Sequence, residues 1–159
     1  MRMVLIAAVA CAAIGEPAAA QRYRVLVGSD DGQRSVVEFR PCIPAEGSAC
    51  GAWVDREAVA DANIQLASNS AATFSPGDSV WIEHGAIRIQ GPGKQSKTIA
   101  DRRGAAQALV LAPMRDYAFV ILRAPDAPAS TVVMVDLSTR SIIASCPLQA
   151  RATALAVMR

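Results

Sequence analysis

The chain has 159 residues with 16 basic and 14 acidic side chains, so its formal net charge is +2 at pH 7. This charge is too nearly balanced to imply nucleic acid or an anionic membrane as a partner. Hydrophobic residues make up 52% of the chain, which exceeds the usual ~45–50% and indicates a packed protein rather than a disordered one.

Residues 1–20 have the layout of a cleavable bacterial-type signal peptide. Arg2 supplies the positive charge, residues 4–10 form a short apolar core, and Ala18-Ala19-Ala20 supplies a small-residue cleavage site. The apolar core is too short to cross a bilayer of about 30 Å as a helix. We therefore expect export to the periplasm or beyond, with a mature chain that starts at Gln21.

Two alternatives to this signal peptide stay open. Residues 1–20 could form a buried N-terminal helix, or the chain could be a lipoprotein that is cleaved before Cys11 and acylated there. Beyond residue 20, no segment has the roughly eighteen uninterrupted apolar residues of a membrane-spanning helix. We expect residues 21–159 to form one domain with no transmembrane segment.

Three cysteines remain in the expected mature chain. Cys42 and Cys50 flank a turn-rich loop that can bring its ends together, and export would place them where disulfides persist. We predict a Cys42–Cys50 disulfide, with Cys146 as a buried free thiol. Pairing of Cys146 with either of the others is the alternative.

The mature sequence predicts short antiparallel strands joined by turns. Apolar and β-branched runs alternate with clusters of Gly, Pro, Asp and Ser, which is typical of an all-β domain. One stretch is ambiguous, because helical spacing over 55–66 also permits a short helix. The predicted strands cover 22–27, 35–39, 52–54, 71–74, 79–83, 86–90, 96–100, 107–111, 117–122, 131–136, 141–145 and 152–157.

Eight of these strands form two successive sets of four, over about 71–104 and 105–150. The second set reads as a small-apolar strand with a Pro turn (108–113), an aromatic strand (117–120), a Thr-Val strand (130–137) and an Ile-rich strand (141–148). This pattern resembles the repeat of bacterial surface-layer and YVTN-type β-propellers, over about residues 105–157. The resemblance implies four-stranded antiparallel modules like propeller blades.

The chain departs from that family in two ways. Met114-Arg115 stands where the repeat has Asp-Gly, and the 159 − 20 = 139 mature residues allow about three blades, fewer than a closed propeller needs. We predict an all-β incomplete propeller, with a small β-sandwich or barrel as the alternative. Intramolecular closure of the strand at 152–157 onto the N-terminal strands is expected to be difficult. A strand-exchanged homodimer, or pairing within a sandwich, would cover that edge.

No catalytic, cofactor or metal site is predicted. His84 is the only histidine and falls in a predicted turn. A serine or cysteine catalytic triad that uses any other histidine is therefore impossible. The stretch Gly91-Pro92-Gly93-Lys94 is no phosphate-binding loop, because Arg88 and Gln95 occupy its required glycine and hydroxyl positions. Trp81 and Tyr117 fall in predicted strands, where a core role is expected.

A local basic run of Lys94, Lys97, Arg102 and Arg103 is opposed only by Asp101. Such runs usually form a solvated face, and the functional alternative is an anionic partner such as a lipid headgroup or an acidic polymer. The expected function is a small exported binding or structural protein of the periplasm or cell envelope, without enzymatic activity and with a protein or envelope partner. A periplasmic enzyme or accessory subunit, and a partial propeller completed by oligomerisation, are the alternatives.

Overall fold

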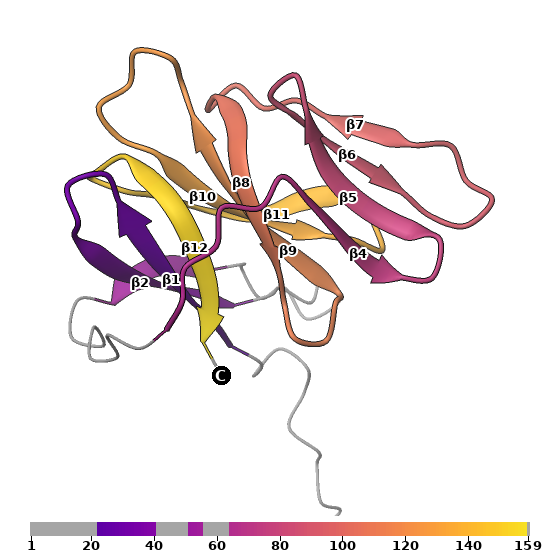
Figure 1. Cartoon of the computed structure of the whole chain (residues 1–159), viewed down its shortest axis with the longest axis horizontal. Coiled ribbons are helices and arrows are strands. Elements are labelled where there is room, and N and C mark those ends of the chain that lie inside the picture. Colours follow the sequence, from indigo (N-terminus) through magenta and orange to yellow (C-terminus); the bar gives the residue numbers. More distant parts are fainter. Residues whose placement is uncertain (1–21, 41–50, 56–63, 159) are drawn as a thin grey trace, which may run out of the picture.

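The computed structural model of the chain describes residues 22–40, 51–55 and 64–158, with only the backbone for 51–55. Throughout these ranges the fold is all-β, as expected, with twelve strands and no helix. The strands form three four-stranded antiparallel sheets (Figure 1). These sheets do not close into a barrel among the described residues, so the barrel alternative is wrong.

Each sheet is built mainly from strands that are neighbours in the chain. We call the sheet of order β12-β1-β2-β3 sheet A, β11-β10-β9-β8 sheet B, and β4-β5-β6-β7 sheet C. The bounds are β1 Tyr23–Ser29, β2 Arg34–Arg40, β3 Gly51–Asp55, β4 Ala71–Ser75, β5 Asp78–Glu83, β6 Ala86–Gln90, β7 Lys97–Ile99, β8 Ala105–Leu111, β9 Tyr117–Arg123, β10 Thr131–Asp136, β11 Ser141–Pro147 and β12 Ala152–Met158.

All twelve predicted strands are present, with ends that differ by at most two residues. Sheets C and B fall within the two stretches, 71–104 and 105–150, that the sequence divides into repeat units. The possible helix over 55–66 lies largely outside the described residues. Its ends carry no helix, because Asp55 ends β3 and residues 64–66 form no regular element.

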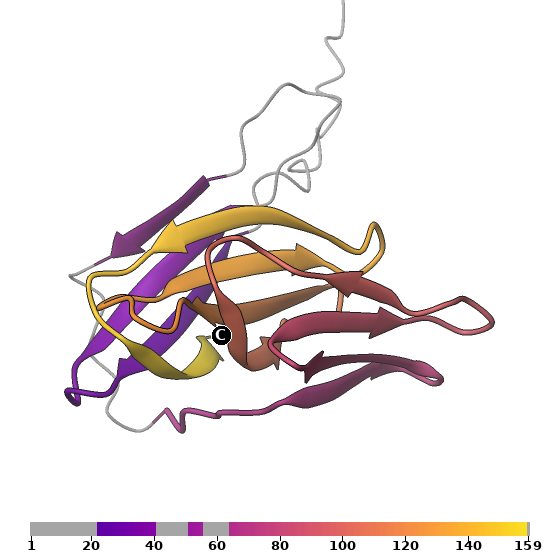
Figure 2. The same cartoon turned by 90° about the horizontal axis from the view of Figure 1, so that it is seen from above.

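Sheet B is the middle of three layers (Figure 2). Along β9, Phe119 and Ile121 face a cluster shared with sheet A, whereas Ala118, Val120 and Leu122 face a cluster shared with sheet C. Successive side chains of a strand point to opposite faces, so both faces of sheet B are buried. This burial explains why β9 and β10 are continuous apolar runs rather than alternating ones.

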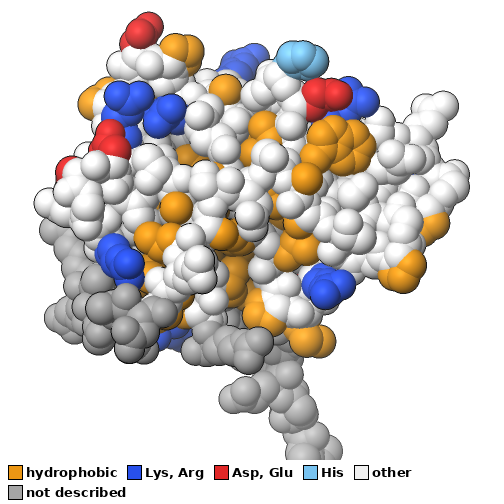
Figure 3. All heavy atoms as spheres, viewed as in Figure 1, with side chains coloured by type: hydrophobic (Ala, Val, Ile, Leu, Met, Phe, Trp, Pro, Cys, Tyr) orange, Lys and Arg blue, Asp and Glu red, His pale blue; other side chains and the backbone are white. Residues whose placement is uncertain are grey.

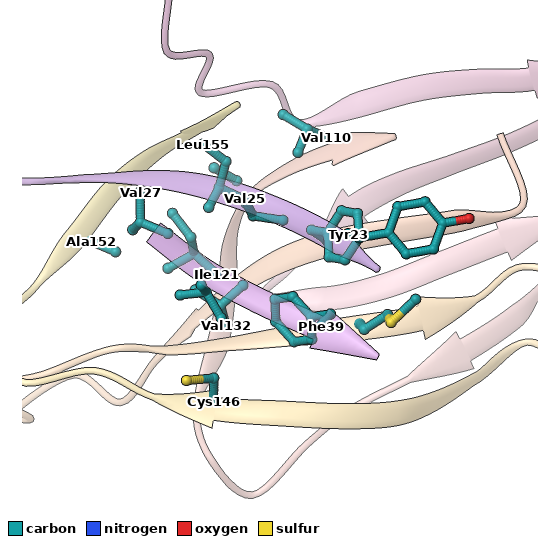
Figure 4. Close-up of a cluster of buried hydrophobic side chains, with 14 of the residues drawn as sticks. Tyr23, Val25, Val27, Phe39, Val110, Ile121, Val132, Cys146, Ala152 and Leu155 are labelled. Carbon is teal, nitrogen blue, oxygen red and sulfur yellow. The ribbon is translucent and has the colours of Figure 1, made fainter. Parts of the chain in front are cut away.

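The core between sheets A and B contains most of the aromatic side chains (Figure 4). Phe39 of β2 lies 5.1 Å from Phe119 of β9 between ring centroids, and Tyr23 of β1 lies 5.8 Å from the same ring. Burying each such side chain stabilises the fold by about 1.5–3 kcal/mol. The aromatic contacts therefore join the N-terminal strands firmly to the middle sheet.

The two terminal strands pair with each other within one chain. β12 lies antiparallel to β1, with Val25 opposite Val157 and Val27 opposite Leu155. The expectation that closure within one chain is difficult is therefore wrong, because the strands complete a sheet of a layered stack and need no closed ring. The edge that a homodimer was expected to cover is already paired.

Residues 64–70, which we call the crossing segment, join all three sheets. Ala67 exchanges two backbone hydrogen bonds of 2.8 Å with Leu155 of β12. Leu109 of β8 and Ile82 of β5 donate their N–H groups to Asn69 and Ser70, each at 2.8 Å. Figure 1 shows this segment passing over β12 and β8 before it enters β4. It fills the place where the first strands of the sheets meet.

Candidate functional site

A cleft of about 340 Å³ opens between sheets B and C. Four hairpin turns meet at this end of the molecule: those between β4 and β5, β6 and β7, β8 and β9, and β10 and β11 (Figure 1). The apolar part of the cleft lining consists of Phe74, Ile89 and Leu137, and the turns supply most of its charged residues. The remaining lining residues are Ser75, Asp78, Gly91, Pro92, Lys94, Arg115, Asp116, Ser138 and Arg140.

Two arginines of the cleft have a left-handed backbone. Arg115 has φ 56° and Arg140 has φ 53°, in the β8–β9 and β10–β11 turns. The turns that sheet C contributes place glycine at such positions, with Gly77 at φ 82° and Gly93 at φ 62°. Left-handed backbone costs a residue with a Cβ atom about 1–2 kcal/mol. Sheet B therefore carries arginine where the turn geometry alone favours glycine.

The basic side chains of the cleft are not neutralised by the protein. Arg140 donates from Nη1 to the backbone oxygen of Gln95 at 3.0 Å, which satisfies a hydrogen bond but no charge. Neither the Arg115 guanidinium nor the Lys94 ammonium has a hydrogen-bond or ion-pair partner in the part of the chain that the structure describes. Three basic and two acidic groups give the cleft a net charge of +1.

The two carboxylates of the cleft are held differently. Asp116 accepts hydrogen bonds from the Tyr23 hydroxyl at 3.2 and 3.4 Å, so its charge is directed toward sheet A. Asp78 has a buried Oδ1 with no hydrogen-bond partner. A buried carboxylate oxygen without a hydrogen-bond partner lowers the stability of the fold. It also adds an acidic group to the wall of the cleft.

The tyrosines behind the cleft stay protonated. Burial, together with the nearby Asp116 charge and hydrogen bond, raises the pKa of Tyr23 far above its usual value of 10.0. Burial, assisted by the charges of Asp136 and Asp116, also raises the pKa of Tyr117. Tyr23 is only 5% exposed and packs edge-on against Tyr117 at 5.4 Å. Its role is therefore that of a hydrogen-bond donor to Asp116.

The predicted basic run is divided between the two ends of sheet C. Lys94 lies in the β6–β7 turn and lines the cleft, and Lys97 is exposed on β7. Arg102 and Arg103 lie in the turn that precedes β8, at the opposite end of the sheet. Arg103 forms two hydrogen bonds of 2.7 Å with Asp101, and this pairing lowers the pKa of Asp101. The four residues do not form one patch.

The other singled-out residues have mostly structural positions. His84 is an exposed turn residue with φ 50°, as expected, and Tyr117 packs against the core. The core role expected for Trp81 is wrong: it is partly exposed on the outer face of sheet C, with the Arg88 guanidinium 5.9 Å from its ring centroid. Cys146 is a free thiol that is 2% exposed.

The cleft is lined by charged, hydroxyl and apolar side chains. Among the described residues, no group of three or more His, Cys, Asp and Glu side chains could hold a metal ion. Likewise, no helix in the described ranges is long and apolar enough to span a membrane. The predicted disulfide partners Cys42 and Cys50 lie outside the described residues.

Four charged residues of the cleft were not predicted from the sequence: Arg115, Arg140, Asp78 and Asp116. The sequence does carry a signal for Arg115, because Met114-Arg115 stands where the blade repeat has Asp-Gly. Arginine is uncommon at a left-handed turn position, so this substitution draws attention to the Arg115 side chain. Searches for matching family models, curated relatives and solved structures found no match.

Proposed function

We propose that the chain is an exported, non-enzymatic binding protein of the periplasm or cell envelope, and that the cleft between sheets B and C takes an anionic ligand. The observation that carries this proposal is the convergence of three basic side chains without acidic partners: Lys94, Arg115 and Arg140. Guanidinium groups bind carboxylate and phosphate oxygens through paired, charge-assisted hydrogen bonds.

The turn geometry supports binding over a structural role. Replacing Arg115 or Arg140 by glycine would relieve left-handed backbone strain, and part of that gain would be offset by the greater flexibility of glycine in the unfolded chain. Retaining arginine at both turns costs backbone stability, and apart from the hydrogen bond of Arg140 to Gln95 it gains only the charge. A ligand that neutralises these guanidinium groups recovers that cost.

Export is part of the proposal and is supported by the position of the first strand. β1 begins at Tyr23, two residues after the expected mature start at Gln21. Cleavage after Ala20 would therefore leave sheet A whole. The N-terminal sequence of the protein recovered from the periplasm should start at Gln21, and a start at an acylated Cys11 would show a lipoprotein instead.

The blade-like nature of the sheets also belongs to the proposal. In sheets B and C the strands follow one another in chain order, and in sheet A β12 precedes β1 to β3. The first strands lie side by side, since β8 contacts both β12 and β4. This order is typical of propeller blades, and it supports the interpretation of an incomplete, three-bladed propeller.

Isothermal titration of the mature chain with inorganic phosphate and with citrate tests the binding proposal. We expect saturable binding that weakens as salt is raised, because exposed charges are screened. Arg115→Gly should weaken binding, whereas Arg102→Gln at the other end of sheet C should not. Equal binding by the wild type and by Arg115→Gly would contradict the assignment of the cleft.

A further inference from the structure

The turn that carries Arg115 also carries the most exposed large hydrophobic side chain of the described residues. Met114 is 73% exposed, whereas the other large hydrophobic residues whose side chains the structure describes are buried or half-buried. An isolated exposed methionine on a protein surface is ordinary. Here it directly precedes a basic residue of the cleft that has no partner, so an apolar group and cationic groups share one end of the molecule.

The neighbouring turns extend this combination. Pro113 is exposed beside Met114, and Pro92 is exposed beside Lys94 in the β6–β7 turn. Figure 3 shows a basic side chain with hydrophobic side chains around it at this end of the molecule, where the β8–β9 turn lies in Figure 1. The residues that line the cleft carry three basic and two acidic groups, so this lining is positive on balance.

We propose that these turns dock the protein on an anionic phospholipid surface, with Met114 as the apolar contact and with Lys94, Arg115 and Arg140 binding headgroup phosphates. The inference rests on the proposed function, because it names the source of the anion that the cleft takes. Charge complementarity selects this occupant: a lipid surface offers clustered phosphates beside acyl chains, and a soluble anion offers nothing for Met114 to contact.

Co-sedimentation with vesicles tests the docking surface in the full mature chain. Vesicles of phosphatidylglycerol mixed with phosphatidylcholine should bind the protein, and vesicles of phosphatidylcholine alone should not. Each basic residue near such a surface contributes about fivefold in affinity, so Lys94→Gln should weaken binding about fivefold. Arg102→Gln is the matched control, because it removes an exposed charge at the opposite end of sheet C, and it should leave binding unchanged.

The apolar contact has its own variant. Met114→Gln keeps the length of the side chain and should weaken vesicle binding while leaving phosphate binding by calorimetry unchanged. Binding to phosphate but not to anionic vesicles would overturn the lipid inference and leave the proposed function intact. If the folded wild-type protein binds neither phosphate nor anionic vesicles, the lipid inference and the proposed function are both wrong. Vesicle binding that is indifferent to Met114→Gln and Lys94→Gln would overturn the docking surface.

Discussion

The hydroxyl of Tyr23 donates a hydrogen bond to the Asp116 carboxylate at 3.2 Å, and this bond connects the first strand of sheet A to a turn of the cleft. The two residues are 93 positions apart in the chain. Tyr23 lies in the core between sheets A and B, whereas Asp116 lies at the edge of the space between sheets B and C. The layer that buries the aromatic cluster thus also fixes one acidic wall of the cleft.

Tyr23→Phe should lower the free energy of unfolding by about 1–2 kcal/mol. The ring would keep its contacts with Tyr117 and Phe119, so the loss reports the hydrogen bond to a charged acceptor. Chemical denaturation at neutral pH measures it. Tyr117→Phe is the control, since no hydrogen bond of its hydroxyl is found in the described part of the chain, and it should cost less. An equal loss in both variants would contradict the role assigned to the Tyr23–Asp116 bond.

Stability should fall as the pH rises above about 9. The folded-state pKa values of Cys146 and Tyr23 are raised above the usual 9.0 and 10.0, mainly by burial. Such groups stabilise the fold fully below their unfolded pKa, and that stability is lost at higher pH because the unfolded chain releases the protons first. Unfolding midpoints measured between pH 7 and about 11 should decline in the wild type. A double variant with Cys146→Ala and Tyr23→Phe should show a flatter profile, and an unchanged slope would contradict the assignment.

Ala67→Pro should destabilise the protein by about 1–3 kcal/mol, because it leaves the Leu155 carbonyl without its donor. Proline removes the N–H that Ala67 donates to Leu155, and that bond attaches the crossing segment to β12. Ala67→Ser keeps the N–H and serves as the control. Thermal unfolding should show a large drop for the proline variant only. If both variants melt together near the wild-type midpoint, the crossing segment does not hold the sheets together.

The thiols should react in two classes. Cys146 is 2% exposed, and burial raises its pKa, so its thiolate is scarce. Peptide mapping without reduction should recover a Cys42–Cys50 cross-link, with Cys146 alkylated only after denaturation. A cross-link that includes Cys146 would contradict both its free state and the predicted pairing.

The strands could be predicted from the sequence because local signals determine them. Sheet B is buried on both faces, so β9 and β10 are apolar throughout, and turns with Pro, Gly and Asp mark their ends. The pairing of β12 with β1 could not be predicted in the same way. It depends on how three layers stack. Closure within one chain was expected to be difficult because a ring of about three blades is too small for its core.

The cleft was harder to predict because its charges come from different sheets. Lys94 belongs to a turn of sheet C, whereas Arg115 and Arg140 belong to turns of sheet B, so only the packing of the two sheets brings them together. The local run of basic residues was a poor guide, since Lys94 and Arg102 lie at opposite ends of β7. A residue type that does not suit its turn, such as Arg115 at a left-handed position, was the better signal.

The measurement that tests the cleft most directly is the stabilisation by citrate of a double variant with Arg115→Gly and Arg140→Gly. Without citrate, this variant should unfold at the same or a higher temperature than the wild type, because both turns favour a left-handed residue. Citrate should raise the unfolding midpoint of the wild type by mass action, and it should raise that of the variant little or not at all. His84→Gly changes a left-handed residue outside the cleft lining and should keep the full citrate effect. An undiminished citrate effect in the double variant would contradict anion binding in this cleft.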